Sequence, residues 1–317
     1  MGRPCFPTER SWKTARRLEA SYIVSLALLL ANECLLTAAF VRTGASALRS
    51  LTFSDSFPLT KWSNSPTKPS SPMTAPAPRN WRINFMLSHR RHRSGLLETK
   101  VLIVNDYKDC GVSYAPFFKE FGKVTENIGE LKLHPYRFRL VVFTGGADVS
   151  PAFYGDTSPK GMCHINSQRD AQEFGLFEWC RRRKIPMFGI CRGMQFLNVM
   201  TGGRMMHDIQ GHISGNHLVQ TRNQEEPFLV NSFHHQMCIP HKDSYILAWS
   251  HQKLSKRYIG DKDEEVEYLG PEVEAFYNLS YSCLGVQWHP EVMPTGGKYE
   301  KGVSWVRSIV KDFIHAT

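Results

Sequence analysis

The sequence predicts an α/β fold in which a doubly wound, mostly parallel sheet is flanked by helices. Two observations support this. Short apolar runs at Val101–Val104, Leu140–Thr144 and Pro186–Ile190 have the length and composition of buried parallel strands. Helical patterns separate them, at Tyr114–Phe121 and Gln168–Lys184. This alternation is typical of βαβ units, whose strands run in the same direction.

The later part of the chain continues the sheet with shorter connections. Four further runs have the apolar character of strands: Phe228–Val230, Tyr245–Trp249, Val273–Tyr277 and Cys283–Trp288. A last helix is expected over Gly302–Ile314, because its apolar residues recur at helical spacing. The residues expected to pack against the sheet are Val303, Val306, Ile309, Val310 and Phe313.

Charge divides the chain into two parts, residues 1–98 and residues 99–317. The first holds 14 Lys and Arg against 5 Asp and Glu, hence +9, whereas the second holds 25 against 24, hence +1. Pro/Ser-rich stretches in residues 1–98 are linker-like, so we expect a basic, mostly disordered extension followed by one catalytic domain. Nucleic-acid binding by that domain has no electrostatic support.

The extension contains an apolar segment over residues 22–41, which Asn32 and Glu33 interrupt near its middle. Membrane contact is expected only through this segment, and the sequence leaves open whether it is a targeting or anchoring segment or part of a disordered extension. The eight cysteines form no Cys-x-x-Cys pair and no regular framework. A reducing compartment, the cytoplasm, is therefore the expected location.

Cys191 lies in the arrangement of a nucleophile elbow, Gly-x-Cys-x-Gly. An apolar run ends at this cysteine and a helical pattern begins directly after it. Gly189 and Gly193 are expected because a Cβ at either position would collide with the neighbouring backbone. The N-terminus of the following helix favours a thiolate at the cysteine, which is the form that attacks a carbonyl carbon.

Two other predicted strands end in residues that complete this chemistry. The run from Leu140 is followed by Gly145 and Gly146, a turn able to present backbone N–H groups. The run from Cys283 is followed by His289, with Glu291 two residues later. A nucleophile, a donor loop and an oriented base are the parts that acyl transfer requires.

The motifs GICRGMQ, FTGGADVSP and VQWHPE resemble the three signatures of the class I glutamine amidotransferase family, whose fold is flavodoxin-like. The longer strings TGGADVSPAFYG, SQRDAQEFGLFEW and VNSFHHQ resemble its γ-glutamyl-γ-aminobutyrate hydrolase branch. The resemblance covers residues 99–317, with the motifs in the expected order.

The resemblance implies a cysteine-dependent hydrolase that cleaves a γ-glutamyl amide through a γ-glutamyl thioester on Cys191. His289 would transfer protons and Glu291 would orient its ring, which completes a Cys-His-Glu triad. The oxyanion hole would consist of the backbone N–H groups of Gly146 and Arg192.

By the same resemblance, several residues would bind the glutamyl group: Gly145, Gln195, Asn231, Ser232 and His234. Asp148 and the pair Arg169-Asp170 match motifs of the branch too. For these three, a structural ion pair and direct substrate contact are equally compatible with the sequence.

No metal and no cofactor is expected. Histidines 207, 212, 217, 234 and 235 are near Asp208 in the sequence, but their spacings fit no zinc pattern. The substrate would be a small γ-glutamyl compound whose amine the sequence does not identify. An alternative is a glutaminase subunit that delivers ammonia to a separate synthetase partner, and a third is a catalytically inactive binding homologue, against which the intact triad argues.

Overall fold

The computed structural model describes residues 98–105, 113–213 and 215–317, and the apolar segment 22–41 lies outside these ranges. Among the described residues, none of the helices combines the length and the apolar character needed to cross a bilayer. The helices are α3 (Ala115–Phe118), α4 (Ile128–Leu133), α5 (Ser167–Arg183), α6 (Arg192–Met200) and α7 (Glu300–Ala316). The strands are β1 (Lys100–Val104), β2 (Lys123–Thr125), β3 (Phe138–Phe143), β4 (Met187–Ile190), β5 (Arg204–Met206), β6 (Asp208–Ile209), β7 (Asn216–Thr221), β8 (Gln224–Asn231), β9 (Met237–Ile239), β10 (Tyr245–Ser250), β11 (Tyr258–Ile259), β12 (Glu265–Val266), β13 (Val273–Asn278) and β14 (Cys283–Val286).

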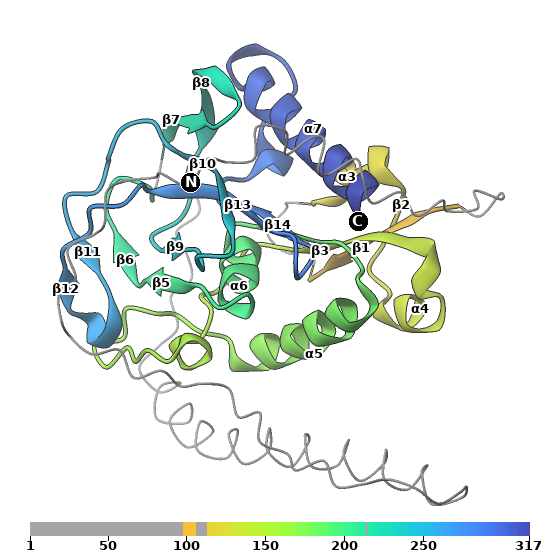
Figure 1. Cartoon of the computed structure of the whole chain (residues 1–317), viewed down its shortest axis with the longest axis horizontal. Helices are drawn as coiled ribbons and strands as arrows, with labels where there is room; N and C mark the ends of the chain where they lie inside the picture. The colour runs from red at the N-terminus through yellow and green to blue at the C-terminus, as the bar shows by residue number, and fades with distance from the viewer. Residues whose placement is uncertain (1–97, 106–112, 214) are drawn as a thin grey trace, which may run out of the picture. The chain divides into compact units, whose positions relative to one another are not determined.

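The predicted parallel sheet is present and forms one half of a larger sheet. Its strands lie in the order β2, β1, β3, β4, β14, and each neighbouring pair is parallel (Figure 1). The crossover between β3 and β4 contains α5, a helix long enough to connect two parallel strands in a βαβ unit. This half carries the three stretches for which the sequence predicted catalytic roles.

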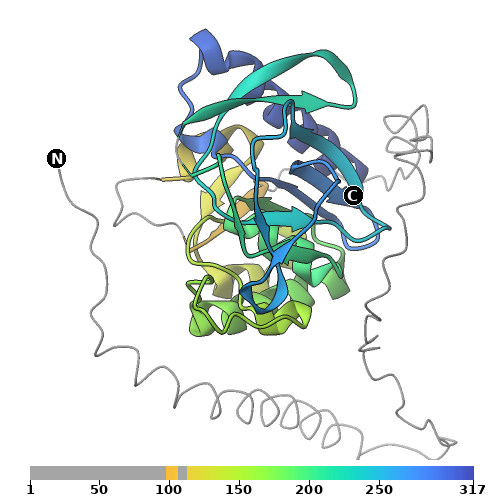
Figure 2. The same ribbon diagram turned by 90° about the vertical axis from the view of Figure 1, so that its left-hand side faces the viewer.

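The other half of the sheet is antiparallel. From β14 the order continues through β13, β10 and β7 to β8, and each of these neighbours is antiparallel. The hairpin of β7 and β8 lies at the far edge of this half (Figure 2). The shorter β5 and β9 pair with each other, and β9 also pairs with β13. A separate small sheet contains β12, β11 and β6.

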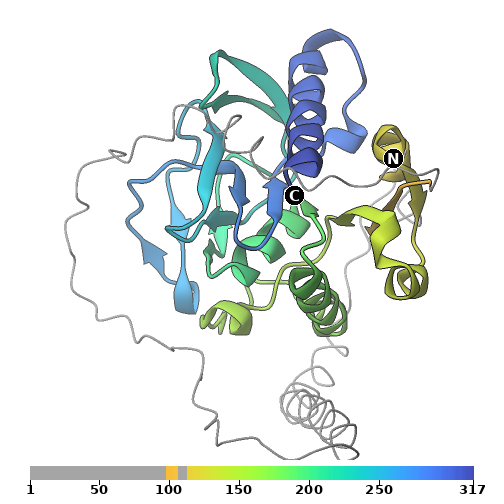
Figure 3. The ribbon, with the colours of Figure 1, turned by 45° about the vertical axis from the view of Figure 1, so that its right-hand side comes forward.

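Two hydrophobic layers cover the two faces of the sheet, as predicted for a doubly wound fold. Val101 and Ile103 of β1 belong to one cluster with residues of α3 and α7, whereas Leu102 and Val104 belong to another with residues of α4, α5 and α6. The alternation follows from the two-residue period of a strand. Figure 3 shows α7 and α5 on opposite sides of the sheet. All five residues predicted to pack from the last helix are buried.

The bounds of several elements differ from the expected ones for local reasons. The helix predicted over Tyr114–Phe121 is a short α3 that continues as a 3₁₀ turn at Lys119–Phe121. α5 begins where the Asn166 side chain accepts a hydrogen bond from the Arg169 N–H at 3.1 Å, an N-cap. β14 ends at Val286, so the residues leading to His289 already leave the sheet.

Candidate active site

Cys191 occupies a strained turn between β4 and α6. Its backbone has φ 51° and ψ −112°, a conformation rarely adopted by a residue with a side chain. A Cβ added at Gly189 would lie 2.4 Å from the Gly193 carbonyl group, and one added at Gly193 would lie 2.0 Å from the Phe143 oxygen. The predicted requirement for glycine at both positions is therefore confirmed. The turn places the cysteine at the N-terminus of α6.

His289 and Glu291 form a short hydrogen-bonded pair beside this turn. His289 Nδ1 lies 2.6 Å from Glu291 Oε1, and the carboxylate is buried. Because β14 is parallel to β4, the residues that follow the two strands reach the same edge of the sheet. The hydrogen bond at Nδ1 fixes the orientation of the imidazole ring. The other ring nitrogen, Nε2, points away from the carboxylate and is available to the cysteine.

The electrostatic environment of His289 depends on both partners. Burial lowers the pKa of this imidazole, but the adjacent Cys191 thiolate and the Glu291 carboxylate outweigh burial and raise the pKa to about 11. The cysteine is thus near enough to His289 to change the pKa of its imidazole. A charged imidazole beside a cysteine is the environment in which cysteine nucleophiles become reactive.

The loop after β3 lies against the side chains of Cys191 and His289. A Cβ added at Gly145 would lie 2.9 Å from His289 Cε1 and 3.7 Å from Cys191 Cβ. Gly146 has φ 135°, a conformation that favours glycine. Glycine at these positions therefore allows the loop to approach Cys191 and His289 this closely.

A buried network of charges holds this loop in place. Arg169 donates to the carbonyl oxygens of Gly145 at 2.7 Å and Thr144 at 2.8 Å, and Arg192 donates to that of Ala147 at 3.1 Å. Glu173 pairs with both guanidinium groups, at 2.6 Å from Arg169 Nε.

Asp170 completes the network. It pairs with Arg192 and accepts a hydrogen bond from the Ser150 N–H at 3.1 Å. The alternative of a structural ion pair is therefore what the structure shows for Arg169 and Asp170. Glu173 did not emerge from the sequence analysis, although its spacing of four residues from Arg169 on a predicted helix was an available signal.

We expect Glu173→Gln to destabilise the protein by roughly 3 kcal/mol, because it leaves two buried guanidinium groups without a full countercharge. Urea denaturation measures the free energy of unfolding. The matched control is Glu178→Gln on the same helix, which removes a more exposed ion pair with Arg181 and should cost less than about 1 kcal/mol. Equal losses for the two variants would contradict a special role of the buried network.

Asn231 contacts the backbone of His289. Its Nδ2 donates to the His289 carbonyl oxygen at 2.9 Å, and its Oδ1 accepts from the His289 N–H at 2.8 Å. Both ends of the amide are therefore occupied in fixing His289. Its predicted contact with substrate stays a prediction.

The other residues predicted to bind substrate have diverse surroundings. Gln195 is buried one turn into α6, where its amide donates to Gln287 at 3.4 Å. Ser232 Oγ donates to the His212 carbonyl oxygen at 2.8 Å. His234 is buried, with Nδ1 2.9 Å from the Gln236 carbonyl oxygen. These contacts leave their predicted roles toward a glutamyl group untested.

Tyr114 is a site residue that sequence reasoning missed. Its hydroxyl oxygen accepts a hydrogen bond from the Gly145 N–H at 3.1 Å. Burial raises the pKa of this phenol, and the nearby charge of Glu291 raises it further. The side chain thus connects the glycine loop to the Glu291 carboxylate. Nothing in the sequence pointed to it, because it lies far from every motif along the chain.

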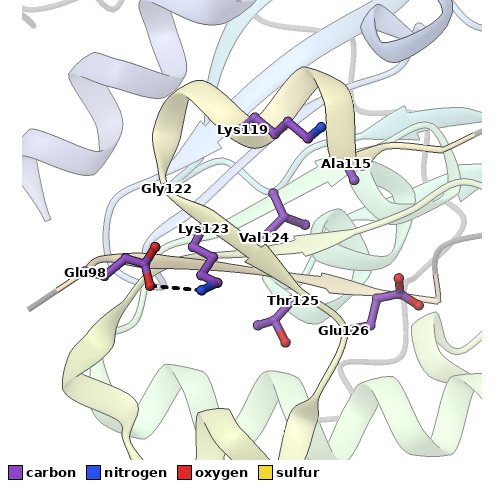
Figure 4. Close-up of a pocket in the computed structure, with 8 residues that line it drawn as sticks. All are labelled: Glu98, Ala115, Lys119, Gly122, Lys123, Val124, Thr125 and Glu126. Atoms are coloured by element: carbon purple, nitrogen blue, oxygen red, sulfur yellow. Dashed lines mark ion pairs between the residues drawn. The ribbon is translucent and has the colours of Figure 1, made fainter.

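A pocket of about 530 Å³ lies elsewhere, at the edge of the sheet beside β2 (Figure 4). An ion pair of 3.2 Å between Glu98 and Lys123 lies at this pocket. Of the described residues that line it, none belongs to the predicted catalytic set. We therefore assign the chemistry to the edge where β3, β4 and β14 end.

Comparison with known proteins identifies the family. The family model described as Peptidase C26 matches residues 136–291, a range that includes Cys191, His289 and Glu291. The chain is 32% identical over 170 residues to a putative glutamine amidotransferase-like protein of Lactococcus lactis, which spans 48% of this chain and 65% of that protein. Residues 136–291 are thus assigned to the Peptidase C26, class I glutamine amidotransferase-like family. The resemblance inferred from the motifs is thereby confirmed.

Two further similarities accompany this assignment. The chain is 30% identical over 166 residues to the γ-glutamyl-CDP-amidate hydrolase of Campylobacter jejuni, covering 51% of this chain and 66% of that enzyme. The crystal structure of a glutamine amidotransferase from Thermotoga maritima superposes with a TM-score of 0.43 at 17% identity, covering 67% of this chain and 84% of that one. The matched regions thus span about two thirds of both curated relatives.

Proposed function

We propose that the protein hydrolyses a γ-glutamyl amide to glutamate and a free amine. The observation that carries the proposal is the convergence of three strand ends: the Cys191 turn, the glycine loop after β3, and the His289–Glu291 pair at 2.6 Å. These supply a nucleophile, donors for an oxyanion and an oriented base. The similarity to a γ-glutamyl-CDP-amidate hydrolase supports the same bond type.

In the first half of the reaction, the Cys191 thiolate attacks the γ-carbonyl carbon. The backbone N–H groups of Gly146 and Arg192 stabilise the oxyanion that develops. The Cys191 thiolate contributes to raising the pKa of His289. Its negative charge leaves the sulfur during the attack, so the pKa of His289 falls and its Nε2 proton passes more readily to the departing amine.

The second half releases glutamate from the γ-glutamyl thioester on Cys191. His289, now neutral, accepts a proton from water as the water oxygen attacks the thioester carbonyl carbon. Collapse of the tetrahedral intermediate breaks the carbon–sulfur bond and regenerates the thiolate–imidazolium pair. Glu291 holds the ring orientation through both halves. We place this activity in residues 99–317 and in a reducing compartment, the cytoplasm, since the chemistry requires a free thiol.

A panel of γ-glutamyl amides tests the proposal. The purified full-length chain is incubated with L-glutamine, γ-glutamyl-γ-aminobutyrate and a γ-glutamyl nucleotide amidate, and glutamate release is measured without any added protein. We expect one amide other than glutamine to react at least about tenfold faster in kcat/KM than glutamine, since a hydrolase recognises its leaving amine.

The alternative of a glutaminase subunit gives the opposite pattern. Such a subunit would release glutamate slowly and from glutamine alone, and a synthetase partner would accelerate it. Mass spectrometry of the quenched reaction supplies a second measurement, because a hydrolase working through a thioester transiently gains the mass of one glutamyl group on Cys191. Failure of every amide in the panel, with no acyl-enzyme, would overturn the proposal.

A further inference from the structure

A buried cluster of histidines and carboxylates lies on the antiparallel half of the sheet. Its central members are His212, His217 on β7 and Glu274 on β13, with exposed fractions of 0%, 7% and 0%. One potential ligand atom from each lies within 4.8 Å of the other two. In the sequence the histidines and Asp208 fit no zinc spacing, and Glu274 lies too far along the chain to stand out as a member of the group.

One carboxylate oxygen is the centre of the cluster. Glu274 Oε1 lies 3.1 Å from His217 Nε2, 3.4 Å from His212 Nδ1 and 3.6 Å from His234 Nε2. Ligand atoms of a tetrahedral zinc ion, at metal distances of about 2.0–2.1 Å, lie ~3.3 Å from one another. The observed separations bracket that value.

These contacts lack the directions of hydrogen bonds. Among the described residues, the facing atoms of His212, His217, His234 and Glu274 have no hydrogen-bond partner. This holds for His217 Nε2 even though it lies only 3.1 Å from the carboxylate oxygen. Burying so many unpaired polar atoms is costly. Lone pairs that converge on one point, instead of on one another, are the arrangement that a cation satisfies.

The outer nitrogens of two of the rings have partners typical of metal ligands. His212 Nε2 lies 3.1 Å from Glu272 Oε2, and His234 Nδ1 lies 2.9 Å from the Gln236 carbonyl oxygen. In metal centres such contacts hold the proton on the outer nitrogen and direct the lone pair of the other nitrogen toward the ion.

Glu272 is itself fixed in place. Its carboxylate accepts hydrogen bonds from the Leu254 N–H at 2.9 Å, the Ser255 N–H at 2.8 Å and the Tyr258 hydroxyl at 2.7 Å. The carboxylate behind His212 is therefore oriented independently of the cluster. An outer shell of this kind is difficult to explain as the by-product of apolar packing.

We infer that this cluster binds one divalent cation of the zinc class, through His212 Nδ1, His217 Nε2 and Glu274 Oε1. Imidazole and carboxylate ligands suit zinc. The ion would take no part in bond cleavage, because the cluster is sealed from solvent by its own elements.

Such an ion would stabilise the two segments that position His289, the base of the proposed mechanism. Ser232, next to Asn231, donates to the His212 carbonyl oxygen, and Asn231 holds the backbone of His289. On the other side, the Glu274 carbonyl oxygen accepts from the Gln287 N–H at 2.7 Å, two residues before His289. The cation would thus fix both segments that carry the catalytic base.

Metal analysis of the full-length chain tests this inference. The chain is produced in zinc-supplemented medium, purified without chelators, and measured by inductively coupled plasma mass spectrometry. We expect about one equivalent of metal in the wild type and in Cys191→Ala, and at least a tenfold lower content in His217→Ala and Glu274→Gln. Adding dipicolinate should lower the unfolding midpoint of the wild type, and excess zinc should restore it.

The matched control is His207→Ala. His207 is as buried as His212, and its Nδ1 lies 2.9 Å from Asp263 in a geometry that does make a hydrogen bond. This variant should keep its metal. Wild-type protein with less than a tenth of an equivalent and no response to dipicolinate would overturn the inference, whether or not the variants fold. So would metal lost in Cys191→Ala but kept in His217→Ala, which would locate the ion at the thiol. The measurement uses no substrate, so its outcome is separate from that of the proposed hydrolase activity.

Discussion

Replacing Cys191 by alanine should abolish turnover and leave the protein folded. The strained backbone at this position is the same for cysteine and alanine, and among the described residues no second thiol stands at the end of β4. In an enzyme whose nucleophile and base act as a unit, losing the nucleophile removes about 10⁴ or more in kcat. Steady-state glutamate release and the thermal unfolding midpoint measure the two halves of this expectation.

Cys191→Ser sharpens the same prediction. A hydroxyl group is not ionised by the adjacent imidazolium, so the serine variant should be almost as inactive as the alanine variant. Cys163→Ala is the control, since this half-buried cysteine lies outside the triad, and it should keep full activity. Turnover within tenfold of wild type in either Cys191 variant would exclude a covalent mechanism at this residue.

His289→Ala and Glu291→Gln should differ in severity. His289 transfers the proton, so its removal should approach the loss expected for Cys191→Ala, about 10⁴ in kcat. Glu291 only orients and charges the ring through Nδ1. Glu291→Gln keeps the shape of the side chain but favours the wrong tautomer, and we expect a loss of roughly 10–10³, mainly in kcat. His251→Ala, at an exposed histidine, is the control for both.

The pH profile separates orientation from a purely structural role of Glu291. His289 donates its proton only while it is charged, so activity falls as the pH rises through its pKa, which its partners raise to about 11. Removing the Glu291 charge lowers that pKa. The alkaline limb of kcat/KM should therefore move to lower pH in Glu291→Gln. An unchanged limb together with an unchanged kcat would remove Glu291 from the catalytic set.

The sequence predicted the part of the fold that short-range signals encode. The runs that became β1, β3 and β4 are continuous and apolar, and glycine pairs mark the turns at Gly145 and Cys191. The antiparallel half was foreseen only as separate strands. Its order depends on which strand edges pair across 24 to 32 residues of chain, as for β10 with β13 on one side and β7 on the other, and periodicity carries no such information.

The candidate site divides in the same way. The predicted triad followed from motifs in which each residue lies within five residues after a strand end. The roles of Tyr114, of Asn231 on the backbone of His289, and of Glu173 beside Arg192 could not be foreseen, because each depends on a partner from another part of the chain. Glu274 and the histidines facing it are a further example. The role of a buried polar residue can be inferred only when the residues that contact it are known.

The position of β14 has a consequence for protein synthesis. This strand is made after all the other strands, yet it lies in the middle of the sheet, between β4 and β13. Until it emerges from the ribosome, the edge of β4 stays unpaired and Cys191 has no histidine beside it. Long-range pairing of this kind forms late in folding. A chain that ends before residue 283 would therefore lack the central strand of its sheet and the histidine that the proposed mechanism pairs with Cys191.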